Sequence, residues 1–133
     1  MVVFVDSSAF YSAIDGSDEF HEKSKQTFEM LFSQKQDFVT SNYVVVETLT
    51  LLQNRLGISD ARNFSKYIIP LIKIIWVEEW MHEAGLNAML TAGKRKLSLV
   101  DCVSFEIMRR LGIETAFTFD RHFKLQGFKC IPA

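Results

Sequence analysis

Val2-Val3-Phe4-Val5-Asp6-Ser7-Ser8 stands near the start of the chain and joins an apolar run to an acid and two hydroxyl side chains. A short continuous apolar run is typical of a strand that is buried on both faces of a sheet. Residues 7–14 then have a helical pattern that ends at Asp15-Gly16. The stretch therefore predicts a buried strand followed at once by a helix, with Asp6 at the junction.

The same alternation continues along the 133-residue chain. We predict further strands at 38–40, 72–77, 115–119 and 128–131. Further helices are predicted at 18–35, 42–56, 59 to a kink near Pro70, 78–92, 98–111 and 122–125. Strands that alternate with helices form a parallel sheet covered on both faces. We expect one domain over residues 1–133, an α/β fold in which a three-layer α/β/α sandwich surrounds a mostly parallel sheet of about five strands.

Composition excludes several classes of protein. Hydrophobic residues make up 48% of the chain, which is too many for a disordered protein. A net charge of -1 carries little information by itself, but proteins that bind nucleic acid by bulk charge are usually basic, so any such contact here must be local. Cys102 and Cys130 fit free thiols in a reducing cytoplasm, with a disulfide between them as the less favoured alternative. No apolar run reaches the roughly 20 residues that span a membrane, so we expect a cytoplasmic protein without membrane contact.

Four acids stand at comparable places in the predicted elements. Asp6 and Asp120 follow strands, Asp101 lies in the first turn of a helix, and Glu47 lies within a helix. Function collects where the carboxyl ends of parallel strands meet, so Asp6 and Asp120 are expected near each other. Each acid also has a simpler interpretation. Asp6 and Asp120 are candidate helix N-caps, Asp101 forms a capping box with Ser98, and Glu47 faces solvent.

Together the four acids indicate a metal site. Clustered carboxylates repel one another and raise each other's pKa unless a cation lies between them. Oxygen ligands without His or Cys companions select Mg²⁺ or Mn²⁺, and such a site supports metal-assisted attack on a phosphate ester. If the acids meet, the carboxylate of Asp101 must lie within about 8 Å of Asp6 or Asp120, the reach of a pair of ions roughly 4 Å apart.

Four motifs that contain these acids occur in a fixed order. They are Val-Asp-Ser-Ser at 5–8, Ser-Asn-Tyr-Val-Val-Val-Glu-Thr at 41–48, Leu-Ser-Leu-Val-Asp-Cys at 97–102 and Thr-Phe-Asp-Arg-His-Phe at 118–123. In this series the chain resembles the PIN-domain ribonucleases, particularly the VapC-like toxins of prokaryotic toxin–antitoxin pairs. The resemblance covers essentially the whole chain.

The resemblance implies a site and a set of partners. Asp6, Glu47, Asp101 and Asp120 match the acidic quartet that binds one or two Mg²⁺ or Mn²⁺ ions and serves catalysis. Ser7 and Thr118 match hydroxyl positions that support the acids or the bound water. Family members cleave RNA and leave a 5′-phosphate and a 3′-hydroxyl. The resemblance also implies a cognate antitoxin protein, with a segment that fills the cleft and a basic side chain near the acids, and a homodimer.

Other residues have two interpretations. Lys94, Arg95, Lys96 and Arg121 are candidate contacts to RNA phosphates, with solvated loop charge as the alternative. Trp76 and Trp80 are interpreted as core or dimer-interface residues.

The sequence therefore predicts a Mg²⁺-dependent endoribonuclease. The alternative is a catalytically silent PIN-like module that binds only RNA or a partner. A receiver-like phosphoacceptor module is disfavoured, because such modules pair acids after the first strand and place a Lys after a late strand. Here two serines follow Asp6, and no Lys ends the strand before Asp120.

Overall fold

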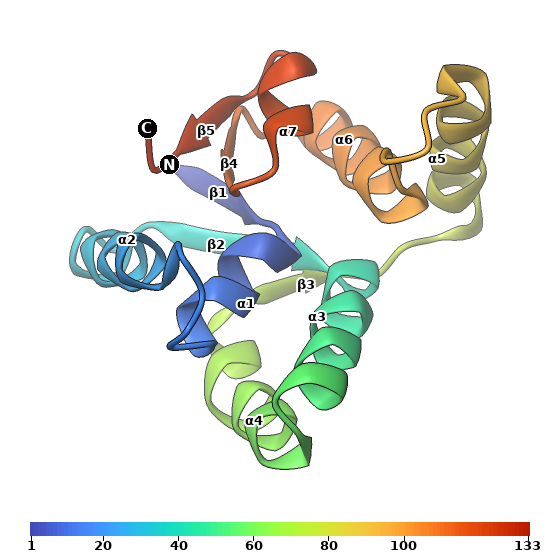
Figure 1. Cartoon of the computed structure of the whole chain (residues 1–133). Coiled ribbons are helices and arrows are strands. Elements are labelled where there is room, and N and C mark those ends of the chain that lie inside the picture. Colours follow the sequence, from blue (N-terminus) through green and yellow to red (C-terminus); the bar gives the residue numbers. More distant parts are fainter.

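The structure is a computed structural model that describes all residues from 1 to 133. Its centre is a five-stranded sheet of order β3-β2-β1-β4-β5 in which every neighbouring pair is parallel (Figure 1). The strands are β1 Val2–Val5, β2 Asp37–Ser41, β3 Lys73–Ile75, β4 Thr115–Phe117 and β5 Lys129–Ile131. The expected fold class is confirmed, and the sheet is parallel throughout rather than mostly so.

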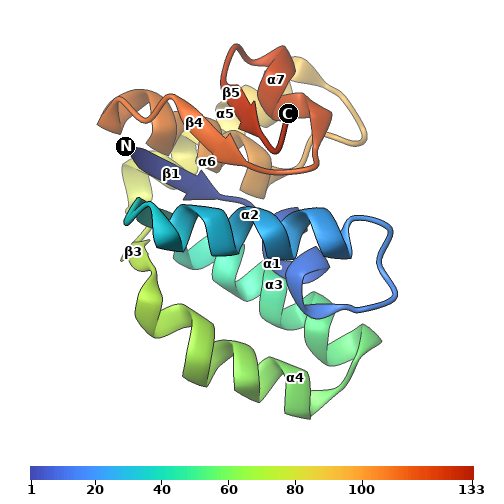
Figure 2. The same cartoon turned by 90° about the vertical axis from the view of Figure 1, so that its left-hand side faces the viewer.

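Helices cover both faces of the sheet. They are α1 Ser7–Ile14, α2 His21–Ser33, α3 Asn42–Arg55, α4 Ile58–Asn63, α5 Glu79–Ala92, α6 Leu99–Leu111 and α7 Arg121–Leu125. A π-helical turn, η1 Phe64–Ile68, and a 3₁₀ turn, η2 Ile69–Leu71, follow α4 where the kink near Pro70 is predicted. Helix α6 lies over one face with α5 outside it, and α1 and α2 lie over the other (Figures 1 and 2). No helix has the length and the apolar composition needed to cross a membrane.

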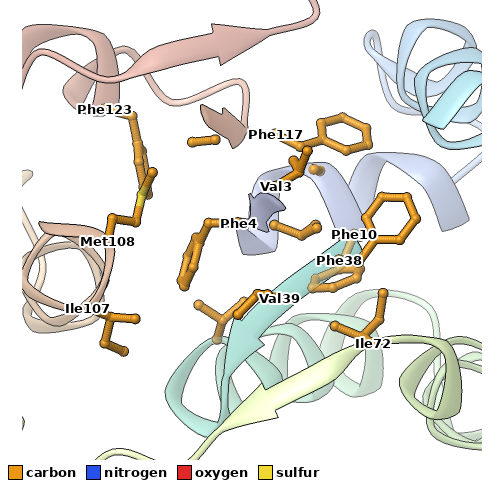
Figure 3. Packing of buried hydrophobic residues seen from close by; sticks show 14 of the residues in the cluster. Val3, Phe4, Phe10, Phe38, Val39, Ile72, Ile107, Met108, Phe117 and Phe123 are labelled. Carbon is orange, nitrogen blue, oxygen red and sulfur yellow. The ribbon is translucent and has the colours of Figure 1, made fainter. Parts of the chain in front are cut away.

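The apolar run of β1 is buried on both sides, as its sequence predicts. Val3, Phe4 and Val5 have no exposed surface. Figure 3 shows Phe4 directed toward Met108 on α6, whereas Phe38 of the neighbouring strand lies on the opposite side beside Phe10. Successive side chains of a strand point to opposite faces, so a run of apolar residues supplies both halves of the core.

Two predicted boundaries are wrong in ways that matter for the site. Helix α2 begins at His21 rather than Asp18, because the Asp18 carboxylate accepts the N–H of Phe20 at 2.8 Å and forms a turn before the helix. Strand β4 ends at Phe117 rather than 119. The N–H of Phe119 then donates to the Ser8 hydroxyl at 3.0 Å instead of to a strand, so the chain bends toward α1.

The strand order places β1 next to β4 at the point where the order reverses. The chain builds β1, β2 and β3 in one direction and then adds β4 and β5 on the other side of β1. The N–H of Asp6 donates to the carbonyl of Phe117 at 3.0 Å and ties the two strand ends together. In open parallel sheets, ligands bind beyond the carboxyl ends of the strands at this reversal.

Close packing of α5 against α6 fixes the helix that contains Asp101. Gly85 of α5 makes the approach possible, because a Cβ added there would lie 2.4 Å from Cγ2 of Val103. The position of α6, and with it the first turn that contains Asp101, depends on this contact between helices.

Candidate active site

Asp6 is a buried carboxylate with two hydroxyl donors. It stands directly after β1 and is only 3% exposed. Its side chain forms no capping bond to α1, so the N-cap interpretation of the carboxylate is wrong. Instead, Oδ2 accepts hydrogen bonds from the hydroxyls of Ser8 at 2.8 Å and Thr118 at 3.0 Å. Thr118 was predicted as a supporting residue; Ser8 was missed, although it stands two positions after the acid.

Asp101 forms the capping box that its spacing predicts. The Ser98 hydroxyl accepts the N–H of Asp101 at 3.1 Å, and Oδ2 of Asp101 accepts the N–H of Ser98 at 3.2 Å. Capping and a site role are compatible, because the cap occupies one carboxylate oxygen. Ligand atoms of Asp101 and Asp120 lie within 4.8 Å of each other, inside the limit of about 8 Å set by a shared metal pair.

Asp120 caps α7 and also contacts a histidine. Its Oδ1 accepts the N–H of His122 at 2.9 Å and lies 2.7 Å from Nδ1 of the same residue. One ligand atom each of Asp101, Asp120 and His122 lies within 4.8 Å of the other two. His122 was not predicted as a ligand. Its sequence signal is its place in the first turn of a helix that follows a site acid.

Glu47 faces the other acids rather than bulk solvent. The buried face of α3 consists of Val44, Thr48 and Leu52, and Glu47 beside it is only partly exposed. The Ser7 hydroxyl donates to Oε1 of Glu47, so the predicted supporting residue contacts one of the four acids. The solvent-facing interpretation of Glu47 is wrong, because α1 packs against α3 and places Ser7 over this side chain.

In each of the four acids, only one of the two carboxylate oxygens accepts hydrogen bonds. Oδ2 of Asp6, Oε1 of Glu47, Oδ2 of Asp101 and Oδ1 of Asp120 accept hydrogen bonds, and the second oxygen of each acid accepts none. None of these second oxygens is a buried atom without a partner; the sole such atom is Oε1 of Gln36. Each acid is therefore oriented through one oxygen and presents the other to accessible space.

The four acids line one cleft of about 460 Å³. Of the predicted phosphate contacts, Lys96 lines this cleft, whereas Lys94, Arg95 and Arg121 are exposed outside its lining. Arg55 also lines the cleft and was not predicted. Its sequence signal is its position two helical turns after Glu47, on the same side of α3.

Burial and mutual repulsion raise the proton affinity of two acids. The pKa of Asp6 rises from 3.8 to about 7, chiefly through burial and further through the charges of Asp101 and Glu47, against the lowering effect of its hydroxyl donors. The pKa of Asp101 rises to about 6, through burial first and then through the charges of Asp120 and Glu47. No Lys or Arg forms an ion pair with the four acids; the one ion pair joins Asp120 to His122. A bound cation would relieve this repulsion.

The donor set fits a divalent cation. Four carboxylate oxygens face accessible space, the imidazole of His122 lies beside those of Asp101 and Asp120, and hard oxygen ligands suit Mg²⁺ and Mn²⁺. A profile of the PIN domain matches residues 3–129. The chain belongs to the PIN-domain family. PIN nucleases depend on divalent metals, and the cleft of this PIN domain has an acidic cluster capable of holding one.

One relative is similar along nearly its full length. The chain is 33% identical over 131 residues to the 23S rRNA-specific endonuclease VapC20 of Mycobacterium tuberculosis, covering 96% of this chain and 95% of the relative. The crystal structure of that protein, described as a sarcin–ricin loop cleaving toxin, superposes with a TM-score of 0.83 at 30% identity, covering 95% of each chain.

Two more distant structures share the fold. FitAcB from Neisseria gonorrhoeae matches with a TM-score of 0.70 at 15% identity, over 96% of this chain and 95% of that one. VapBC2 from Rickettsia felis, bound to a DNA fragment from its promoter, matches with a TM-score of 0.72 at 12% identity, over 98% and 97%.

Proposed function

We propose that this PIN-domain ribonuclease is the toxin of a toxin–antitoxin pair and hydrolyses RNA phosphodiester bonds with Mg²⁺, or Mn²⁺, bound by Asp6, Glu47, Asp101 and Asp120. The observation that carries the proposal is the division of each carboxylate into one oxygen held by the protein and one oxygen left accessible. Four oriented oxygens in one cleft are a preorganised ligand set.

The residues around the acids have distinct tasks in this proposal. Ser8 and Thr118 orient Asp6, and Ser7 orients Glu47, so the accessible oxygens are fixed before a cation arrives. A divalent cation held by these acids would offset the repulsion among them and would activate water for attack on a phosphodiester. Asp101 lies in the first turn of α6, and Asp120 is the N-cap of α7 and accepts an N–H of its first turn; a negative charge is favoured at both places.

Basic side chains position the RNA backbone. Lys96 and Arg55 line the cleft on different elements and are assigned to the phosphates nearest the reacting bond. Lys94, Arg95 and Arg121 are exposed outside the lining and are assigned to phosphates farther along the strand. A net charge of -1 is compatible with this arrangement because the contacts are local.

The relative that cleaves the sarcin–ricin loop supports ribosomal RNA as the first substrate to test. The chain is 33% identical to that endonuclease along 96% of its own length. A hairpin with the sarcin–ricin loop sequence is therefore the substrate of choice, with total RNA as the unbiased alternative.

The proposal includes partners and a location. The acidic cleft suits a basic side chain of an antitoxin segment that blocks it. Trp76 is 71% exposed and Trp80 is 40% exposed, so the core interpretation of these residues is wrong, and we assign them to a homodimer interface.

An RNA substrate and the free thiols of Cys102 and Cys130 fit the cytoplasm. We treat residues 1–133 as one functional domain.

Cleavage assays test the proposal. The purified chain should cut the hairpin or total RNA in the presence of Mg²⁺ or Mn²⁺ and leave 5′-phosphate and 3′-hydroxyl ends, and chelation should stop the reaction. Asp6→Asn and Asp101→Asn should abolish cleavage while the fold persists, whereas Asp37→Asn, at an exposed acid at the start of β2, should cleave normally. Full activity in either site variant would refute the assignment. A silent module would show no tight Mn²⁺ site by calorimetry.

A further inference from the structure

Two phenylalanine rings are stacked in the lining of the acidic cleft. The rings of Phe20 and Phe119 have centroids 4.5 Å apart and planes only 8° from parallel. Phe20 lies just before α2 and Phe119 just after β4, and both residues line the cleft that contains the four acids. Both side chains are partly exposed. The pair therefore forms an apolar part of the lining in a mostly polar cleft.

The hydrophobic core does not account for Phe20. This residue belongs neither to the buried core nor to the partly buried side chains packed against it. Phe119 does pack against the core, and its ring meets the buried Phe117 edge-on at 6.2 Å. Phe20 is thus the outer ring of the pair. Its apolar surface is in contact with the cleft rather than with the protein interior.

The two stacked rings of Phe20 and Phe119 lie next to the hydrogen bonds that orient the acids. Phe119 immediately precedes Asp120, and consecutive Cα atoms are about 3.8 Å apart. The Ser8 hydroxyl accepts the N–H of Phe119 at 3.0 Å and donates to Asp6 at 2.8 Å. A ligand that lies on these rings is therefore next to the acids. If the ligand is a nucleic acid, the group that lies on the rings is the base of a nucleotide beside the scissile phosphate.

Charged side chains line the same cleft as the two rings. The Asp18 carboxylate accepts the N–H of Phe20, so a negative charge lies beside the platform and repels phosphate. The cations that line the cleft are Arg55 and Lys96. The Arg55 guanidinium lies 5.2 Å from the ring centroid of Tyr11, whose hydroxyl donates to Asp15 at 2.6 Å. Beside the Asp18 carboxylate, the ring of Phe20 suits an uncharged aromatic base better than a phosphate, and Arg55 and Lys96 are the cations of the cleft lining that suit phosphates.

We propose that Phe20 and Phe119 form a stacking platform on which an unpaired base next to the scissile phosphate lies. The inference rests on the proposed ribonuclease function of the same cleft. A base within a duplex is stacked between its neighbours and is not available to an aromatic side chain, whereas bases in loops are. Stacking tolerates any base, so the platform selects unpaired over paired nucleotides rather than one sequence.

Photo-cross-linking tests the contact directly. The probes are two RNA hairpins, one with 5-iodouridine at every loop uridine and one with 5-iodouridine only in the stem. The full chain with Asp101→Asn is used so that the RNA stays intact. We expect the loop probe to cross-link to Phe20 or Phe119, as located by mass spectrometry, and the stem probe to give no adduct at either residue. Absence of a loop adduct at both residues overturns the proposal.

Binding and kinetics test whether the rings contribute as aromatic surfaces. In the same background, Phe20→Leu should weaken binding of the loop hairpin by about 5- to 100-fold, the value of one base stack, and Phe20→Tyr should restore it. Phe32→Leu, at an exposed phenylalanine outside the cleft, is the matched control and should bind normally. In the active chain, Phe20→Leu should raise KM and leave kcat nearly unchanged, with unaltered urea unfolding.

The outcomes separate this inference from the proposed function. A chain that cleaves RNA with the same KM after Phe20→Leu refutes the platform and leaves the ribonuclease assignment intact. A chain that shows the loop adduct and the binding loss but never cleaves RNA supports the platform and refutes the assigned chemistry.

Discussion

Asp6→Asn should remove a pH-dependent loss of stability from the metal-free protein. The pKa of Asp6 is about 7 in the folded chain, against an ordinary value of 3.8, chiefly because the carboxyl group is buried. A carboxyl group with a raised pKa binds its proton more tightly in the folded state than in the unfolded state. Its stabilising contribution is therefore complete below about pH 4 and is lost as the pH rises through about 7.

The size of this loss of stability follows from the proton affinities of the Asp6 carboxyl group in the folded and unfolded states. Each tenfold difference in proton affinity corresponds to about 1.4 kcal/mol. Between about pH 5 and pH 8, Asp6 alone should lower the free energy of unfolding of the original protein by roughly 2 to 3 kcal/mol. Asn has no proton to lose, so the variant lacks this decrease. Other titrating groups are common to both proteins and largely cancel in the comparison.

The substitution preserves the local geometry. Oδ2 of Asp6 accepts from the Ser8 and Thr118 hydroxyls, and the carbonyl oxygen of Asn accepts from them equally well. The amide N–H₂ then replaces Oδ1, the oxygen that accepts no hydrogen bond. Because Asp101 and Glu47 raise the pKa of Asp6 through their charges, an amide donor in its place is favoured over a carboxylate.

Urea unfolding in EDTA, followed by circular dichroism, measures the effect at about pH 5 and pH 8. Asp37→Asn controls for the change in net charge. Asp37 is exposed at the start of β2, whereas Asp6 follows the carboxyl end of β1. If the original protein and Asp6→Asn lose the same stability between the two pH values, the reasoning about burial of Asp6 is refuted. Added Mn²⁺ at pH 8 should stabilise the original protein more than the variant, because the ion binds only the folded state.

Two other predictions follow from the same contacts. Affinity for Mn²⁺ should fall by at least about tenfold between pH 8 and pH 5.5 in calorimetry, because ligands with pKa values of about 7 and about 6 must release protons before they bind the ion. An affinity that does not change over this range would place the ion elsewhere. Gly85→Ala should destabilise the protein by about 1 to 3 kcal/mol in urea unfolding, because the added Cβ would lie 2.4 Å from Val103 Cγ2. A fully stable Gly85→Ala protein would show that α5 shifts freely on α6.

Local sequence determined the elements because their signals act over a few residues. Val2–Val5 is a continuous apolar run, and a strand covered on both faces buries Val3, Phe4 and Val5 and leaves only Val2 exposed. The spacing of Ser98 and Asp101 determines the capping box, since both hydrogen bonds lie within one helical turn. Burial of β1 also determines that Asp6 stands at a strand end, whereas Asp120 lies three residues after β4, at the N-cap of α7.

The predicted element boundaries were wrong where contacts with distant residues compete with the local sequence pattern. The apolar Phe119 extends the pattern of β4, but its N–H donates to Ser8, which lies more than a hundred residues earlier in the chain. Strand β4 therefore ends at Phe117. Nothing in the neighbourhood of Phe119 in the sequence indicates this partner.

The stretch from Val2 to Ser8 shows most clearly which features the sequence determines and which depend on the tertiary structure. Its sequence alone determines a buried strand, a helix and an acid between them, because these follow from hydrophobic pattern and chain geometry. Only the tertiary structure decided which hydroxyl serves which acid: Ser8 donates to Asp6, and Ser7 donates to Glu47 on another helix. It also decided that Arg55 and Phe20 line the same cleft. Such contacts depend on how helices pack across the sheet, and that packing is set by the whole core rather than by any local pattern.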